Sequence, residues 1–550
     1  PFNFTVIFLM CTTIWRACWM TWAGRAKRKG TGRDFWNWRP IVRGRTKRVA
    51  GYRDTVHHQT RINWTLLGPV CFSWGAVLIG MMLAQTGLAS RAEAAPNVLF
   101  IISDDLTAEA LSCYGPTQCQ TPHIDRLARR GVRFTRAYCQ YPVCGPSRAA
   151  LMSGLYPQSI GVTSNGQSRK FTDNLGERPS LAEWFKRHRY YTARVSKIYH
   201  MRVPGDITAG VDGPDHPASW TERFNCRAPE WKTAGVHQHL TSQKLNPDRS
   251  KHYNLGFGTA FYTVQSDGPG TEQADVQAVD KAIELLQTPR TKPFFLAVGL
   301  VRPHVPLVAP KAYFRQFSAT DMKLAPAVAD DWSDIPAAGR SLNARRIGLA
   351  GQPAKQQAVL AAYYAAVAFM DAQVGRLLSA LERGGHQQNT VVVFTSDHGY
   401  HLGEHDFWQK LSLHEESARI PLIIAGPAIQ PAVTESLAQQ IDLFPTLAEL
   451  AGLSVPEHCQ GKSLLGTLRN PQHRVHNDVY CMKRGAHLLR SERWAWLSYQ
   501  DGSAELYDMR NDPRQFTNLV DQPAHAEVVG QMRRRLAARL DWIGNVSQRR

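Results

Sequence analysis

Between residues 97 and 425, short uninterrupted apolar runs alternate with longer amphipathic segments. A run of four to eight apolar residues predicts a strand buried on both faces, whereas apolar residues spaced by three or four predict a covering helix. The predicted strands are residues 97–102, 191–195, 294–300, 390–395 and 421–425, and the predicted helices are residues 122–130, 180–188, 273–287 and 356–382. This alternation predicts an α/β fold with a mostly parallel sheet flanked by helices.

A different pattern begins near residue 469. Four short runs, at residues 479–482, 486–490, 494–499 and 504–507, are separated by turns and followed by a predicted helix over residues 525–540. They predict a small antiparallel sheet. We therefore expect a large domain over residues 96–468, in which the candidate site described below would lie, and a small C-terminal domain over residues 469–550. Residues 204–250 and 325–353 lack periodicity and are expected to form long loops near the mouth of a site.

The first 95 residues differ from the rest in charge. The chain has a net charge of +20, and residues 1–94 contribute +11 of it through 14 Lys and Arg residues against three acidic ones. We expect residues 1–62 to be a basic extension, either disordered or spurious, and residues 63–95 to be a cleaved signal peptide, because an apolar run precedes Ala92-Glu93-Ala94. The alternative is an uncleaved membrane anchor. Both interpretations place the globular part outside the cytoplasm, in the periplasm or secreted.

The remaining charge of +9 does not require a polyanionic partner. No zinc-finger, RRM or basic-zipper pattern is present in the sequence, so nucleic acid is not an expected partner. A mildly basic surface suits an anionic substrate, and a solvated surface explains it equally well.

Charged and histidine side chains follow the predicted strands. In parallel sheets, ligand sites lie at the carboxyl ends of the strands. Asp104, Asp105 and Asp397 offer hard oxygen ligands that suit Ca²⁺, and they would repel one another without a cation between them. The four strand ends carry Asp104-Asp105, Ser196-Lys197, Arg302-Pro303-His304 and Asp397-His398. The sequence therefore predicts a site at this edge of the sheet.

Cys144 opens the pentapeptide Cys144-Gly145-Pro146-Ser147-Arg148, which leads into a predicted helix. Pro146 suits the first turn of that helix, where free N–H groups and the helix dipole favour an anion. Seven cysteines follow residue 95, and an odd number leaves at least one thiol unpaired. A capped turn with a buried structural cysteine explains the pentapeptide alone equally well. No disulfide pairing is predicted.

The pentapeptide resembles the signature of the type I, formylglycine-dependent sulfatases. Further similar segments occur in the order of that family, namely NVLFIISDDL (97–106), TPHIDRLARRGVRFTRAY (121–138), TSDHGYHLGEHDFWQK (395–410), DLFPTLAELAGL (442–453) and ELYDMRNDP (505–513). The resemblance covers residues 96–519. Within the family, the chain is most similar to the iduronate-2-sulfatase group, through residues 197–200, RPHVP at residues 302–306, and the Asp397-His398 pair. The resemblance implies an alkaline-phosphatase-like fold and a sulfuric ester hydrolase.

The resemblance also implies roles for individual residues. Asp104, Asp105, Asp397 and His398 would bind one Ca²⁺ together with position 144, where a formylglycine-generating enzyme would have converted the cysteine to formylglycine. Its hydrate would attack the sulfur of a sulfated carbohydrate, and Arg148 would favour the deprotonated nucleophile. His304, with Lys410 nearby, would protonate the leaving oxygen or bind the sulfate. Lys197 would neutralise the sulfate, and His200 would take the proton as sulfate leaves.

Two other functions stay open at this point. A phosphate or phosphonate ester hydrolase could use the same scaffold, because both esters are tetrahedral anions. A non-catalytic protein that binds sulfated polysaccharide is the second alternative, although all the expected site residues are present. His405 and His414 have no assigned role. His414 departs from the family pattern, which usually has Phe there, and it could touch the substrate or pack.

Overall fold

The computed structural model describes residues 95–246, 256–341 and 343–548. The basic extension and, apart from Ala95, the signal peptide lie outside this part of the chain, so both stay predictions.

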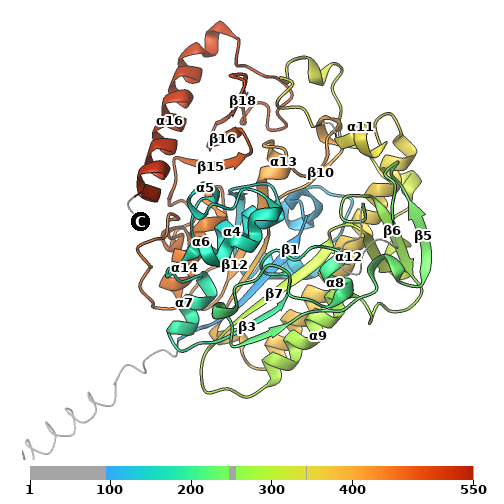
Figure 1. The fold of residues 1–550 in the computed structure, drawn as a ribbon, viewed down its shortest axis with the longest axis vertical. Coiled ribbons are helices and arrows are strands. Elements are labelled where there is room, and N and C mark those ends of the chain that lie inside the picture. The colour runs from blue at the N-terminus through green and yellow to red at the C-terminus, as the bar shows by residue number, and fades with distance from the viewer. Residues whose placement is uncertain (1–94, 247–255, 342, 549–550) are drawn as a thin grey trace, which may run out of the picture. The chain divides into compact units, whose positions relative to one another are not determined.

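A nine-stranded sheet lies at the centre of the fold, in the order β13–β2–β12–β9–β1–β7–β3–β4, with β14 paired to β2 (Figure 1). Strand β1 pairs in parallel with β7 and β9, and β12 is antiparallel to its neighbours β2 and β9. The strands are β1 (Asn97–Asp104), β2 (Gly131–Tyr138), β3 (Tyr191–Ser196), β4 (Glu222–Phe224), β7 (Phe294–Pro303), β9 (Thr390–Ser396), β12 (Arg419–Ala425), β13 (Ala432–Thr434) and β14 (Ala438–Gln439). The predicted mostly parallel sheet is confirmed, with β12 as its antiparallel member.

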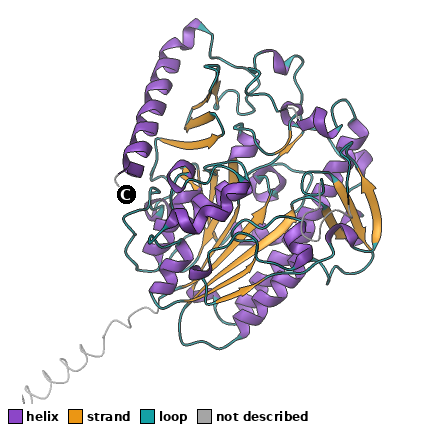
Figure 2. Ribbon diagram, in the orientation of Figure 1, coloured by secondary structure: helices purple, strands orange, loops and turns teal. Residues whose placement is uncertain are grey.

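Helices cover both faces of this sheet, as Figure 2 shows. Leu99 and Ile101 of β1 pack in one core with the helices α3 (Pro122–Ala128), α9 (Ala274–Gln287) and α12 (Pro353–Arg383). Val98 and Phe100 point the other way, into a second core with α4 (Cys144–Ser153), α7 (Leu181–Arg187) and α14 (Leu443–Leu450). Because β1 is apolar on both faces, it can only be stable between two such layers. Helix α12 is apolar and long enough to cross a membrane, but most of it is buried in the first core.

A separate four-stranded antiparallel sheet follows, which confirms the second predicted sheet. It consists of β15 (Asp478–Lys483), β16 (Ala486–Ser491), β17 (Trp494–Tyr499) and β18 (Ala504–Asp508). Leu488 and Leu497 face the second core of the large sheet, whereas Leu489 and Trp496 pack against α16 (Ala526–Gln548). The small sheet is therefore fixed against the layer that contains α4.

The prediction of a long loop over residues 204–250 was wrong in part. This stretch contains α8 (Gly205–Ala209), strand β4 and strand β5 (Gly235–His239). β5 pairs with β6 (Tyr262–Ser266), which pairs with β8 (Leu307–Pro310). Strand β5 exposes four of its five residues, so it lacks the apolar alternation on which sequence reasoning relies. Strand β2 was also missed, because Arg and Thr interrupt its apolar positions.

Candidate active site

Three carboxylates meet at the carboxyl ends of β1 and β9. These strands are parallel, with Ser103 opposite Ser396, so the residues that follow each strand share one edge of the sheet. Asp104, Asp105 and Asp397 are at most 1% exposed, and each offers an oxygen within 4.8 Å of the others. Buried carboxylates at this spacing repel one another unless cations are close.

The backbone is left-handed at two of these strand ends. Asp105 has φ of 62° and Ser196 has φ of 60°, values that non-glycine residues adopt only when the surroundings hold them. The Tyr363 hydroxyl donates to the Asp105 carbonyl at 2.7 Å, and the Asp105 amide donates to Asp397 Oδ1 at 3.2 Å. These bonds hold the bend that directs the Asp105 side chain into the site.

Three cations lie against the carboxylates. Arg148 Nε is 2.9 Å from Asp397 Oδ2, Lys197 pairs with Asp104, and Lys410 Nζ is 2.6 Å from Asp105 Oδ1. Burial alone would raise the pKa of Asp104, but Lys197 together with His304 and Arg148 holds that pKa well below its usual value. Burial raises the pKa of Asp397, and His398 and Arg148 offset this only in part.

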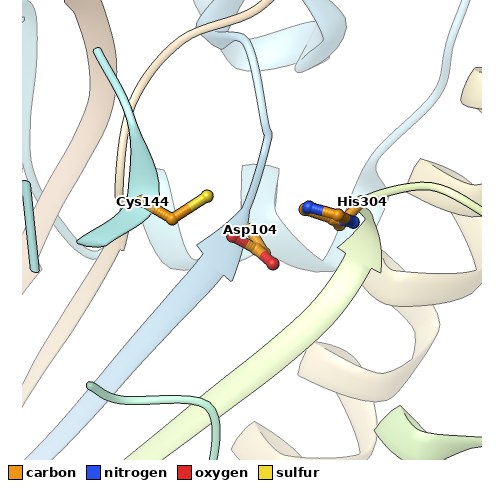
Figure 3. Close-up of side chains that lie close together, drawn as sticks. All are labelled: Asp104, Cys144 and His304. Atoms are coloured by element: carbon orange, nitrogen blue, oxygen red, sulfur yellow. The ribbon is translucent and has the colours of Figure 1, made fainter. Parts of the chain in front are cut away.

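Cys144 is the first residue of α4 and is 1% exposed. Its Sγ lies 3.3 Å from His398 Nε2, 3.3 Å from Lys410 Nζ and 3.8 Å from Asp105 Oδ1. Figure 3 shows the thiol at the start of α4, pointing toward the end of β1 with Asp104 and the end of β7 with His304. Burial raises the pKa of this thiol well above its usual value. An unmodified Cys144 is therefore a poor nucleophile at neutral pH.

The neighbours of Cys144 in the pentapeptide fix its place. A Cβ on Gly145 would lie 2.2 Å from Ser168 Oγ, so only glycine fits there. The Ser147 hydroxyl donates to the Asp397 carbonyl, which ties α4 to the end of β9. Arg148 Nη1 donates to the carbonyls of Lys197 at 2.5 Å and Ile198 at 3.1 Å, which ties α4 to the end of β3.

Three histidines complete the site. Nδ1 of His304 lies 2.6 Å from the Val305 carbonyl and Nδ1 of His398 lies 2.8 Å from the Gly399 carbonyl. A carbonyl only accepts, so each Nδ1 carries a proton. Burial lowers the pKa of His304 to about 4 and that of His200 well below its usual value. Buried Nδ1 of His200 has no hydrogen-bond partner among the described residues.

A network that sequence reasoning missed holds His304. Arg302 is buried, donates to the His304 carbonyl at 3.2 Å, and makes two 2.9 Å bonds to Glu230. Asp275 accepts the backbone amides of Val301 and Arg302 at 2.6 Å and 3.0 Å. Glu230 lies in the aperiodic stretch 204–250, so no local pattern could identify it.

His414 has a structural role in this fold. It is fully buried, its Nε2 lies 2.9 Å from Glu505 Oε2, and its Nδ1 lies 2.7 Å from Ser412 Oγ. It therefore links the segment after Lys410 to β18 of the small sheet. His405 similarly pairs through Nδ1 with Asp331 at 2.9 Å.

The predicted site residues thus lie together. The structure brings Cys144 and the three carboxylates together with His398, Arg148, Lys197, His304 and Lys410, and places His200 four residues after Ser196 at the end of β3. The sheet order and this cluster at the carboxyl ends of the strands define an alkaline-phosphatase-like α/β hydrolase.

Comparison with known proteins specifies the class further. A family model described as sulfatase matches residues 96–453, and one described as N-sulphoglucosamine sulphohydrolase, C-terminal, matches residues 403–541. The chain is 31% identical to iduronate 2-sulfatase of Homo sapiens over 455 residues, which is 72% of this chain and 79% of that protein. The chain therefore belongs to the sulfatase family, and it is an enzyme of that class.

Solved structures show the same fold. One is described as a complex with its substrate D-glucosamine-2-N,6-O-disulfate; it has a TM-score of 0.63 and 22% identity and covers 82% of this chain and 98% of its own. Another is the phosphonate monoester hydrolase of Agrobacterium radiobacter, with a TM-score of 0.66 and 22% identity, covering 82% of this chain and 96% of its own. The fold is therefore shared with enzymes that act on sulfur and on phosphorus esters.

Proposed function

We propose that this sulfatase removes sulfate from a sulfated sugar or polysaccharide, using formylglycine formed from Cys144 and one Ca²⁺ bound beside it. The main support is the position of the Cys144 Sγ, 3.3 Å from both His398 Nε2 and Lys410 Nζ and 3.8 Å from Asp105 Oδ1. Burial raises the pKa of this thiol, so the thiol itself would be a poor nucleophile. A nucleophile formed by converting Cys144 is consistent with this environment.

The residues at the strand ends fit a Ca²⁺ ion. Asp104, Asp105 and Asp397 supply hard oxygen donors within 4.8 Å of one another, and His398 turns its Nε2 toward Asp105 at 3.3 Å. The ion would supply a positive charge that favours an ionised oxygen at position 144 and polarises a bound sulfate oxygen. Lys410 and Lys197, which neutralise Asp105 and Asp104 in this structure, would then be available to the anionic substrate.

Formylglycine at position 144 would supply, once hydrated, an oxygen nucleophile for the sulfur atom. Arg148 fixes the start of α4, and with it position 144, because its side chain bonds to Asp397 after β9 and to the Lys197 carbonyl after β3. Lys410 and Lys197 orient and neutralise the sulfate. His304, with Lys410 nearby, would bind the sulfate, or would protonate the leaving alcohol oxygen once the bound anion has raised its pKa and Nε2 has taken up a proton. His200, with its unpartnered Nδ1, would accept a proton as sulfate leaves.

The names of similar proteins indicate the substrate class. One relative is an iduronate 2-sulfatase, and one solved structure is described with a disulfated glucosamine as its substrate. We propose a sulfated sugar for this chain as well, with a uronic acid 2-sulfate as the first candidate. A phosphate or phosphonate ester hydrolase is the alternative, supported by the Agrobacterium radiobacter fold. A non-catalytic polysaccharide-binding protein is the second alternative.

Maturation and location belong to the same proposal. Conversion of Cys144 requires a formylglycine-generating enzyme, and it must act before folding because the folded side chain is 1% exposed. We propose that residues 63–95 direct export and that the mature enzyme acts in the periplasm or outside the cell.

Mass spectrometry of the peptide that contains Cys144, on protein made in its own host, tests the proposal first. Formylglycine makes this peptide about 18 Da lighter. The host-made enzyme should then hydrolyse 4-nitrophenyl sulfate faster than 4-nitrophenyl phosphate. Cys144→Ala should abolish this activity, whereas the control Cys113→Ser, at a half-buried cysteine outside the site, should retain it. An alkylatable Cys144 in active protein, or faster phosphate hydrolysis, would contradict the proposal.

A further inference from the structure

The turn between β15 and β16 of the small sheet contacts two segments that carry active-site residues. The Met482 amide donates to the Gln140 carbonyl at 3.0 Å, and the Arg484 amide donates to Tyr141 Oη at 3.0 Å. Gln140 and Tyr141 belong to the segment that leads to Cys144. The turn is therefore fixed to the backbone that carries the proposed nucleophile.

The same turn contacts the segment that carries Lys410. Lys483 Nζ donates to the Leu411 carbonyl at 3.2 Å, and the Leu411 amide donates to the Pro142 carbonyl at 3.3 Å. Leu411 is 47% exposed, so this junction opens to solvent. Three segments thus meet at one edge of the site, namely residues 140–144, 410–411 and 483–484.

Lys483 has no carboxylate partner within ion-pair distance among the described residues. The nearest acid that affects it is Glu505, whose oxygens already accept from His414 at 2.9 Å, Tyr499 at 2.5 Å and Tyr507 at 2.6 Å. Burial lowers the pKa of Lys483, and Glu505 opposes this only in part. Besides the Leu411 carbonyl, the ammonium has the Tyr499 ring, whose centroid lies 6.0 Å from Nζ. Neither neighbour carries a full negative charge, so a partly buried ammonium here is stabilised by an anion that reaches it.

Arg484 adds a second cation to the turn. Its side chain is exposed, and no ion pair engages it in the described part of the chain. Other arginines of the small sheet do have such partners. Arg493, on the turn at the opposite end of β16, lies 2.7 Å from Asp508. The uncompensated charge of this turn therefore lies at the end of the sheet that contacts residues 140–141 and Leu411.

We propose that Lys483 and Arg484 bind a second anionic group of the substrate, so that the enzyme prefers sulfated sugars with a further carboxylate or sulfate over singly charged sulfate esters. This inference rests on the proposed sulfatase function. The sulfate to be cleaved lies at Cys144 and Lys410, and the second anion lies toward Leu411 and the turn. Selectivity thus comes from the small sheet, whereas the chemistry comes from the large one.

The test compares kcat/KM for three substrates. A uronic acid 2-sulfate carries a carboxylate as its second anion, D-glucosamine-2-N,6-O-disulfate carries a second sulfate, and 4-nitrophenyl sulfate carries none. One charge-assisted hydrogen bond is worth about 10- to 100-fold in affinity. Lys483→Met should therefore lower kcat/KM for at least one dianionic sugar by about 10-fold or more relative to 4-nitrophenyl sulfate, mainly through KM. The sugar whose kcat/KM falls more shows whether the second anion is a carboxylate or a sulfate.

Three controls make the result specific. Lys483→Arg keeps the charge and should retain most of the preference, and Arg493→Met should leave the ratio of the substrates unchanged. Higher salt should reduce the preference of the wild type more than that of Lys483→Met, because the variant lacks the ionic contact. Circular dichroism and thermal melting check that each variant folds.

The outcomes separate the two proposals. Wild-type protein with formylglycine that hydrolyses none of the three esters contradicts the proposed function and removes the basis of this inference. The second-anion site alone is contradicted if the wild type is active and the variants Lys483→Met and Lys483→Met,Arg484→Met do not change its preference. In that case kcat/KM falls equally for all three substrates, or for none of them.

Discussion

The buried pair between Glu230 and Arg302 gives the sharpest prediction for stability. Glu230 is fully buried and Arg302 is 1% exposed, and two 2.9 Å bonds join them. Glu230→Gln keeps the shape but removes the carboxylate that pairs directly with the guanidinium, which leaves only the electrostatic attraction of the buried Asp275. Removing one partner of a buried ion pair typically costs about 3–5 kcal/mol. We expect about 3 kcal/mol here, because the glutamine oxygen still accepts one bond. That loss is a large part of a total stability of about 5–15 kcal/mol.

Urea unfolding measures this change as a shift of the midpoint at constant slope. The matched control is Asp280→Asn, which removes the charge of an exposed pair with Arg376 and should cost less than about 1 kcal/mol. The double variant Glu230→Gln,Arg302→Met should be more stable than the sum of the single losses predicts, because neither member of this ion pair is left as an unpaired buried charge. A loss for Glu230→Gln no larger than that of Asp280→Asn would refute the reasoning.

Three further predictions concern pH, leaving groups and metal. Burial raises the pKa of Asp371 to about 7, so the folded state binds more protons than the unfolded state between about pH 4 and pH 7. The free energy of unfolding should therefore fall as pH rises through that range. Asp371→Asn should flatten this dependence in thermal melts, and an unchanged slope would contradict the prediction. His304→Gln should lower kcat by about 10²–10⁴-fold for a sugar sulfate with a poor leaving group, and by less for 4-nitrophenyl sulfate; equal losses would argue against proton donation. Dialysis against EDTA should abolish activity and Ca²⁺ should restore it, whereas full activity of metal-free protein, checked by elemental analysis, would exclude the proposed ion.

The parts of the fold that sequence reasoning predicted are those in which burial leaves a local pattern. Strands β1 and β9 are apolar without interruption, because both of their faces are covered, and the acidic residues that follow them mark the edge of the sheet. The proximity of Asp104, Asp397 and Cys144 follows from that geometry once the strands are known to be parallel. No comparable signal exists for β5, which is largely exposed.

The remaining features depend on contacts between residues far apart in the chain. Glu230 has φ of 53° and pairs with a residue 72 positions later, so nothing near it in the sequence indicates its partner. His414 was left without a role because its partner Glu505 lies 91 residues away on the small sheet. The same holds for Lys483, whose place at the site depends on the docking of that sheet.

The order of strands in the central sheet bears on how the enzyme folds. Asn97, in β1, is hydrogen-bonded to Thr390, 293 residues later, and Ser103 is hydrogen-bonded to Arg302, 199 residues later. Loops of that length cost entropy before any contact between these strands repays it, so a fold rich in such pairs folds slowly. The active site has no local precursor, because its carboxylates meet only after β1 has paired with both β7 and β9. Nascent chains shorter than about 400 residues therefore lack the site altogether, and synthesis leaves the segment around Cys144 accessible for a long interval.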